Sequence, residues 1–374
     1  MSLTGNLVLI LLALLTIAAV AVVVRYWSRF AGRGFKALAA RAGAIAGVQL
    51  MLLLTVSAAA NDYYGFYSSW GQLAGLASGD LGGSGVAALG NGQTSSTITV
   101  QSSGGLQMPN GDDPQKVGEL QYTTIHGQRT GLSATAIIYL PPQYFQAAYK
   151  DAEFPAAIVS TGYPGDVTKL VSLLRYPSRL ATGIALGTDK PIVLVMMSPM
   201  IVAPRDTECT DVPDGGPQAE TFWADDVPNA VEHRYRVTDQ ARGWGLIGDS
   251  TGGYCALKIA MMNSDRFGSA VSLSGYFSAL QDGTTGDLYG DSQAFRNSND
   301  LMWRIQNLPS PPISVLLTTS KAGEDDYKST LEFAHDAKAP MKVSTLIRAE
   351  GGHNFSTWDA EVAPAMQWLS NELN

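Results

Sequence analysis

Two long apolar segments open the chain. Residues 5–24 carry no charge and are interrupted only by Asn6 and Thr16, and residues 42–60 contain three uncharged polar side chains. A helix rises about 1.5 Å per residue, so roughly 20 apolar residues are enough to cross a bilayer. The pattern therefore predicts a transmembrane hairpin of two helices over residues 1–60.

Charge predicts the orientation of this hairpin. Residues 1–60 hold no acidic residue, and their five basic residues all lie between the two apolar segments: Arg25, Arg29, Arg33, Lys36 and Arg41. Loops rich in Lys and Arg stay on the cytoplasmic side of a membrane, so the segment between the two helices should be cytoplasmic. We therefore expect a multi-pass protein of the cell membrane with everything after residue 60 on the extracytoplasmic side. A second interpretation is that Ala58-Ala59-Ala60 marks a signal-peptidase site. Both interpretations export the C-terminal part.

Residues 61–115 differ from what precedes and follows them. Tyr, Phe and Trp crowd residues 61–70, which suits the headgroup layer of a membrane and suits equally an aromatic satellite of the folded core. Gly, Ser, Ala, Asn and Thr dominate residues 71–114. That composition predicts a flexible linker.

Residues 116–374 alternate between two hydrophobic periods. Short β-branched runs predict strands at 134–140, 156–160, 192–197, 245–247, 270–273, 314–319 and 344–348. Helical spacing predicts helices at 169–186, 222–234, 252–262, 328–338 and 360–369. The alternation predicts an α/β domain with a mostly parallel sheet covered by helices on both faces. Chemistry is then expected just after the strands, at their carboxyl ends.

The overall charge narrows the partners. The chain has 25 basic and 33 acidic residues; without the five basic residues of the hairpin, 20 against 33 leaves −13 for the remainder. A domain this negative disfavours nucleic acid, which is bound by Lys and Arg. Small molecules, lipids and glycans remain as partners, and the sequence does not indicate the oligomeric state.

A candidate nucleophile lies between a predicted strand and a predicted helix. Gly248-Asp249-Ser250-Thr251-Gly252 has the form Gly-x-Ser-x-Gly, in which a sharp strand-to-helix turn lifts the serine hydroxyl to a helix N-terminus. A plain glycine-rich turn that packs a helix on a sheet is the alternative interpretation. The pattern predicts that Ser250 is a nucleophile.

A serine nucleophile requires a base and an acid. Of the four histidines, His353 alone follows a predicted strand on a loop before the closing helix. The loop after residues 314–319 carries three adjacent carboxylates, of which we favour Glu324 and then Asp325, with Asp326 also open. The oxyanion would meet the backbone N–H of Thr251 and that of Tyr163, because Pro164 has none.

The residues around these positions resemble the Putative esterase branch of the α/β-hydrolases. The resemblance spans roughly residues 118–373 and is carried by 245–253, Ser274-Gly275, 220–222, Val227-Pro228 and 352–358. This branch includes S-formylglutathione hydrolases (esterase D) and the mycolyltransferases of mycobacteria and corynebacteria. The resemblance implies an eight-stranded α/β-hydrolase core, Ser250 as nucleophile, His353 as base, an acid near Glu324 and an actinobacterial cell envelope. This sequence departs from the mycolyltransferases in two ways. It begins with two apolar segments, and it shows no evident channel for a long lipid chain.

The two cysteines are placed to pair. Cys255 lies five residues beyond Ser250, and Cys209 lies on a loop after a neighbouring strand. An exported pair oxidises readily, so we expect a disulfide, with two buried free thiols as the alternative.

Together these patterns predict a membrane-anchored serine esterase that acts on a small-molecule or lipid ester. No metal or organic cofactor is expected. Two other functions stay open: an acyltransferase that uses an envelope glycan or lipid as acceptor, and a non-catalytic envelope binding protein with the same fold.

Overall fold

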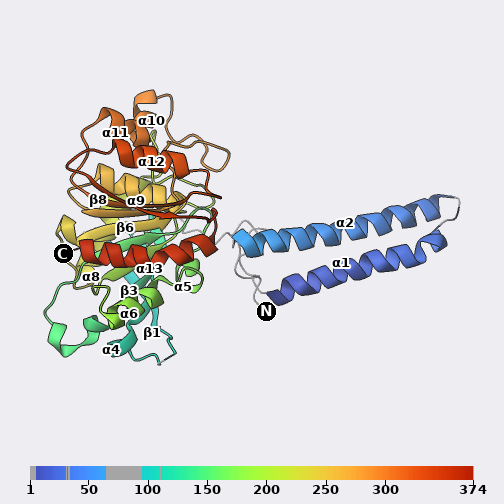
Figure 1. The fold of residues 1–374 in the computed structure, drawn as a ribbon, viewed down its shortest axis with the longest axis horizontal. Coiled ribbons are helices and arrows are strands. Elements are labelled where there is room, and N and C mark those ends of the chain that lie inside the picture. The colour runs from blue at the N-terminus through green and yellow to red at the C-terminus, as the bar shows by residue number, and fades with distance from the viewer. Residues whose placement is uncertain (1–5, 31, 33, 65–94, 110, 374) are drawn as a thin grey trace. The chain divides into compact units, whose positions relative to one another are not determined.

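The computed structural model describes residues 6–30, 32, 34–64, 95–109 and 111–373 (Figure 1). The chain divides into two compact units, Met1–Leu81 and Gly82–Asn374. The predicted aromatic segment from residue 65 and the predicted linker up to residue 94 lie outside the described residues.

The N-terminal unit is a pair of helices. Helix α1 (Asn6–Tyr26) leads through the short η1 (Trp27–Phe30) to α2 (Phe35–Tyr64). The hydroxyl oxygens of Thr16 and Thr55 lie 2.8 Å apart and join the two helices. Both helices are long and apolar enough to cross a bilayer, which fits two membrane spans and also a signal sequence.

The C-terminal unit is built on a nine-stranded sheet with the order β1-β2-β3-β5-β4-β6-β7-β8-β9. The strands are β1 (Thr97–Gly105), β2 (Glu119–His126), β3 (Ser133–Leu140), β4 (Ala156–Ser160), β5 (Val193–Met197), β6 (Trp244–Asp249), β7 (Ser269–Leu273), β8 (Ser314–Ser320) and β9 (Lys342–Arg348). From β5 to β9 every neighbouring pair is parallel, while β1, β2 and β3 pair antiparallel. The predicted, mostly parallel sheet is confirmed.

Strand β1 corrects two expectations. The sheet has one strand more than the eight predicted, and β1 lies inside the predicted linker, whose last part therefore belongs to the folded domain. The alternation Thr97-Ile98-Thr99-Val100 is a strand pattern, but the Ser and Gly residues that follow mask it. Pairing with β2, with Thr97 opposite His126, supplies the hydrogen bonds that this composition does not predict.

Helices cover both faces of the sheet (Figure 1). Buried side chains of α8, α9, α11 and α12 form one hydrophobic core, and those of α5, α6 and α13 form the other. The helices are α4 (Pro114–Val117), α5 (Thr168–Ser172), α6 (Tyr176–Leu186), α7 (Ala219–Thr221), α8 (Val227–Arg234), α9 (Thr251–Met262), α10 (Gln293–Asn299), α11 (Leu301–Asn307), α12 (Tyr327–Asp336) and α13 (Phe355–Glu372). Single turns complete the unit: η2 (Pro142–Phe145), η3 (Ala147–Tyr149), η4 (Phe222–Asp226) and η5 (Ala241–Gly243).

One predicted helix, residues 169–186, is two helices in the structure. Between α5 and α6, Arg175 adopts a left-handed conformation with φ of 56°. Pro177 in the first turn of α6 explains the break, because proline starts a helix well and interrupts one badly.

Candidate active site

Ser250 lies at the sharp turn between β6 and α9. Its backbone has φ of 54° and ψ of −123°. Residues with a side chain rarely adopt this conformation outside functional sites. The flanking glycines let strand and helix approach: a Cβ on Gly252 would lie 2.6 Å from the backbone oxygen of Ser160. The turn therefore presents the serine hydroxyl at the start of a helix, where N–H groups and the helix dipole favour negative charge.

His353 meets this serine. Its Nε2 lies 2.7 Å from Oγ of Ser250 although the two residues are 103 positions apart. The histidine lies on the loop between β9 and α13, and Asn354 caps α13 by accepting a hydrogen bond from the backbone of Thr357 at 3.1 Å. The ring packs edge to face on Trp358 with 5.0 Å between the centroids. Loop, cap and ring contact together fix the imidazole.

Glu324 lies behind the histidine. Its side chain is fully buried, and Oε2 lies 3.6 Å from Nδ1 of His353. The other oxygen, Oε1, accepts a hydrogen bond from Oγ of Ser274 at 3.0 Å. Of the three candidate carboxylates, Asp325 is exposed and Asp326 is half-buried at the start of α12. The structure thus places His353 between Ser250 and Glu324.

The neighbouring carboxylates make the imidazole more basic. Burial alone would lower the pKa of His353, but Glu324, Asp326 and Asp249 outweigh that effect and raise the pKa above its usual value. A basic imidazole in contact with a serine hydroxyl can accept its proton.

The loop after β4 faces the same turn. Its Gly162 would place a Cβ 2.8 Å from Cβ of Ser250, so this loop runs directly beside the candidate nucleophile. Tyr163 follows and donates from its phenol to the backbone oxygen of Pro204 at 2.9 Å. Thr251 is the first residue of α9, where the backbone N–H has no partner within the helix. The two predicted oxyanion donors therefore lie on the two segments that flank Ser250.

Asp249 is a residue whose role the sequence did not reveal. It is fully buried, and its Oδ2 accepts a hydrogen bond from the N–H of Gly162 at 3.0 Å. Burial raises the pKa of Asp249 to about 7, against the opposing effects of Gly162 and His353. The sequence signal that could have identified Asp249 is a carboxylate at the end of a buried strand. In the structure this carboxylate connects the loop after β4 to the turn at Ser250.

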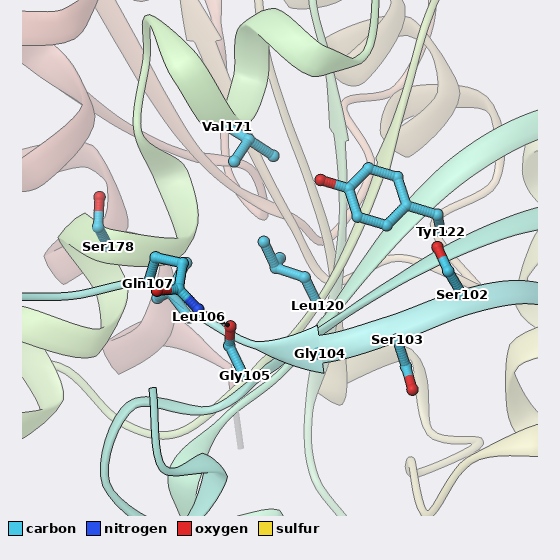
Figure 2. A pocket seen from close by; sticks show the side chains of 10 residues that line it. All are labelled: Ser102, Ser103, Gly104, Gly105, Leu106, Gln107, Leu120, Tyr122, Val171 and Ser178. Atoms are coloured by element: carbon cyan, nitrogen blue, oxygen red, sulfur yellow. Dashed lines mark hydrogen bonds between the residues drawn. The ribbon is translucent and has the colours of Figure 1, made fainter. Parts of the chain in front are cut away.

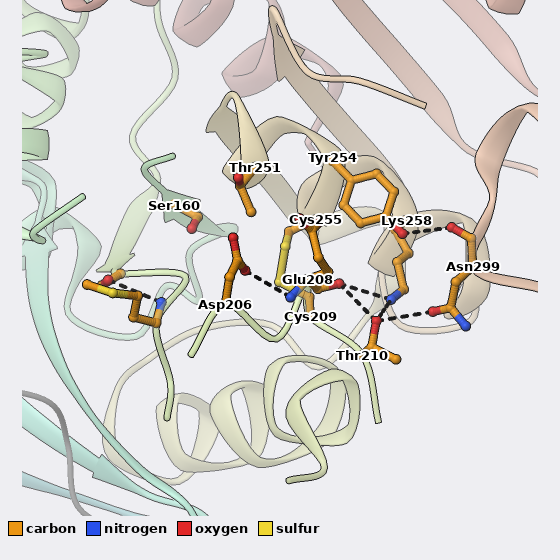
Figure 3. Close-up of a disulfide and its surroundings, with 12 residues drawn as sticks. Ser160, Asp206, Glu208, Cys209, Thr210, Thr251, Tyr254, Cys255, Lys258 and Asn299 are labelled. Atoms are coloured by element: carbon orange, nitrogen blue, oxygen red, sulfur yellow. Dashed lines mark hydrogen bonds between the residues drawn. A yellow bond between two sulfur atoms is a disulfide. The ribbon is translucent and has the colours of Figure 1, made fainter. Parts of the chain in front are cut away.

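The two cysteines form a disulfide (Figure 3). Cys209 and Cys255 are both buried, and the bond joins the segment before α7 to α9. This segment is thereby held against the helix that starts directly after Ser250.

A separate hollow of about 390 Å³ lies between β1, β2 and helices α5 and α6 (Figure 2). Uncharged side chains line it, among them Ser102, Leu120, Tyr122 and Val171. None of the predicted site residues contributes to it. Across the described ranges, no three His, Cys, Asp or Glu side chains are grouped so that they could hold a metal ion.

The sheet order, the turn at Ser250 and its contact with His353 are features of the α/β-hydrolase class. Within that class the chain belongs to the Putative esterase family, whose model matches residues 127–369.

Known proteins give further points of similarity. An uncharacterised protein of Corynebacterium glutamicum is 24% identical over 280 residues, which cover 69% of this chain and 63% of that protein. The chain thus spans less than two thirds of this relative. An S-formylglutathione hydrolase from Agrobacterium tumefaciens shares the fold with a TM-score of 0.58 and 14% identity, covering 74% of this chain and all of that one. The fluorophosphonate-binding serine hydrolase F of Staphylococcus aureus has a TM-score of 0.54 and 16% identity over 68% of this chain and 99% of its own.

Proposed function

We propose that the protein is a membrane-anchored, extracytoplasmic serine esterase that cleaves a carboxylic ester through an acyl-enzyme. The observation that carries this proposal is the 2.7 Å contact between Nε2 of His353 and Oγ of Ser250, with Glu324 buried behind the imidazole. Membership of an esterase family supports the choice of an ester.

The first step forms the acyl-enzyme. Oγ of Ser250 attacks the ester carbonyl while Nε2 of His353 takes the hydroxyl proton. The backbone N–H groups of Thr251 and Tyr163 receive the oxyanion, and loss of one such donor typically costs ~10²–10³ in rate. The imidazolium then gives its proton to the departing alcohol, and the carbonyl re-forms on Ser250.

The second step releases the acid. Water attacks the acyl-enzyme, His353 takes a proton from that water, and the same proton returns to Oγ of Ser250 when the acid leaves. Glu324 orients the imidazole and stabilises its positive charge in both steps. An alcohol of an envelope glycan or lipid can replace water, and the reaction is then acyl transfer.

The test is turnover of p-nitrophenyl esters of increasing acyl length by the detergent-solubilised full chain. We expect Ser250→Ala to abolish turnover and Ser278→Ala, an exposed serine on a neighbouring loop, to leave it unchanged. Equal activity of wild type and Ser250→Ala would contradict the proposal. Product analysis with sugar and lipid alcohols added tells hydrolysis from acyl transfer.

The anchoring is tested separately with single cysteines and a membrane-impermeant maleimide. Ser28→Cys in the turn between the two helices should react only after the cells are permeabilised, whereas Ser278→Cys should react in intact cells. Reaction of both positions in intact cells would contradict the topology. A mature chain that lacks residues 1–60 would identify the second apolar segment as a cleaved signal.

A further inference from the structure

The disulfide belongs to a strained turn beside the candidate active site. Glu208 and Cys209 both have φ of 48°. A left-handed conformation is unfavourable for a residue with a side chain, and it persists where the surroundings enforce it. Here α9 enforces it twice: through the disulfide to Cys255, and through Lys258, whose Nζ donates to the backbone oxygen of Glu208 at 3.1 Å (Figure 3). The turn is fixed against the helix that begins directly after the nucleophile.

The side chain of Glu208 reaches that helix through a tyrosine. Glu208 is 3% exposed, and the phenol oxygen of Tyr276 lies 2.7 and 2.6 Å from its two carboxyl oxygens. The same phenol oxygen lies 3.3 Å from Oγ1 of Thr251. The ring of Tyr276 stacks on Tyr254 of α9 with 4.9 Å between the centroids. Ring stacking fixes where the phenol lies, and Glu208 fixes how its hydroxyl is directed.

We propose that Glu208 is a positioning residue: through Tyr276 it sets the orientation of the Thr251 hydroxyl beside the nucleophile. The inference rests on the proposed function, in which the backbone N–H of Thr251 receives the oxyanion. The disulfide of Cys209 holds Glu208 in place for this task.

Burial and neighbouring carboxylates favour the protonated form of Glu208 by raising its pKa. Burial, followed by the Asp206 carboxylate, raises the pKa of Glu208 to about 8, and Asp282 acts in the same direction. Tyr276 and Lys258 act the other way and are outweighed.

The protonation state decides the direction of the hydrogen bonds. While Glu208 is protonated, its carboxyl donates to the phenol oxygen and Tyr276 donates to Oγ1 of Thr251, so the Thr251 hydroxyl proton is not engaged by Tyr276. Once Glu208 is ionised, its carboxylate accepts the phenol proton, and the Thr251 hydroxyl turns to donate to Tyr276. The ionised form also places a negative charge on Glu208, which is linked to Thr251 through the phenol of Tyr276. Turnover should therefore fall as Glu208 ionises.

The experiment compares kcat and KM of the full chain for one p-nitrophenyl ester, with each sample normalised to its fluorophosphonate-reactive sites. Glu208→Ala and Tyr276→Phe should each lower kcat roughly ten- to a hundredfold and leave KM within about twofold. Because both changes break the same link, the double variant should be no slower than the slower single variant. Tyr276→Phe removes one oxygen and keeps the ring, so it tests the link even if Glu208→Ala folds poorly.

Glu208→Gln provides the readout that a purely structural role would not change. It keeps the shape and a hydrogen bond to Tyr276 but cannot ionise, so the loss of kcat between pH 7 and 9 that is predicted for wild type should be absent from Glu208→Gln. Multiplicative losses in the double variant, unchanged kcat in both single variants, or the same pH profile for Glu208→Gln and wild type would each overturn the inference. Absence of Ser250-dependent turnover in wild type would instead overturn the proposed function.

Discussion

Three adjacent carboxylates on one loop have three different surroundings. Glu324 is buried against Nδ1 of His353 and bonded to Ser274, Asp325 is exposed, and Asp326 starts a helix. The sequence predicted the correct loop because the acid of such a triad follows the strand at residues 314–319. It could not predict which of three adjacent side chains turns inward. Ser274, which fixes Glu324, also has a left-handed backbone, with φ of 48°.

The first prediction concerns the acid. Glu324→Gln should lower kcat/KM by roughly 10²–10⁴-fold, because an amide can neither stabilise the imidazolium nor hold the tautomer in which Nε2 accepts a proton. Asp325→Asn is the matched control and should stay within about twofold of wild type. Steady-state kinetics of the two variants test this assignment. A larger loss of kcat/KM in Asp325→Asn than in Glu324→Gln would contradict it and identify Asp325 as the acid.

A second prediction follows from the basic imidazole. Turnover requires neutral His353, so the acidic limb of the kcat/KM profile should rise through the pKa of this group, with a midpoint above the usual value of 6.5, before the fall expected as Glu208 ionises. Glu324→Gln removes the group that contributes most to raising this pKa and should move the midpoint to lower pH. A pH profile from 5 to 9 measures both midpoints, and an unchanged midpoint in the variant would contradict the coupling.

The strand–turn–helix element around Ser250 was predictable almost completely. Its glycine spacing is a local pattern, and the strand and helix on either side have clear hydrophobic periods. Helices 222–234, 252–262, 328–338 and 360–369 were also found at nearly their observed positions. By contrast, β1 depends on pairing with β2, a contact that its own Ser and Gly residues do not encode, and the break before α6 depends on one residue, Arg175, in a rare conformation.

A third prediction concerns this element. Gly252→Ala should lower the free energy of unfolding by about 1–3 kcal/mol and reduce turnover, because its Cβ would meet the backbone oxygen of Ser160 at 2.6 Å. Gly283→Ala is the control, since nothing lies within 4 Å of its Cβ position. Urea unfolding followed by tryptophan fluorescence compares the two, and equal stability of both variants with wild type would show that the close approach is not needed.

The folded unit as a whole binds protons that the unfolded chain releases. Burial raises the pKa of Glu361, which accepts a hydrogen bond from Thr318, to about 7, and that of Asp249 also to about 7. Between the ordinary carboxyl pKa and these raised values the folded state holds more protons than the unfolded state. Stability therefore falls as pH rises through this window.

The fourth prediction isolates one of these groups. Glu361→Gln should remove on the order of 2 kcal/mol from the difference in unfolding free energy between pH 5 and pH 8, because the amide keeps the Thr318 hydrogen bond and does not ionise. Exposed Glu350→Gln is the control and should keep the wild-type dependence. Urea titrations at the two pH values give the answer, and identical pH dependence in Glu361→Gln and wild type would refute it.

Features of the whole molecule differ in how well the sequence predicted them. Apolar run length located the two N-terminal helices, and alternating periods gave the α/β domain, because both signals accumulate over many residues. Two contacts beside Ser250, Asp249 with Gly162 and Glu208 with Tyr276, join segments far apart in the chain and form only when the sheet brings them together.

The most direct measurement is the site of fluorophosphonate attachment on the detergent-solubilised full chain, mapped by peptide mass spectrometry. The account predicts one adduct, on Ser250, formed faster as His353 loses its proton and absent from Ser250→Ala. An adduct on a different serine, or no adduct on folded protein, would contradict it.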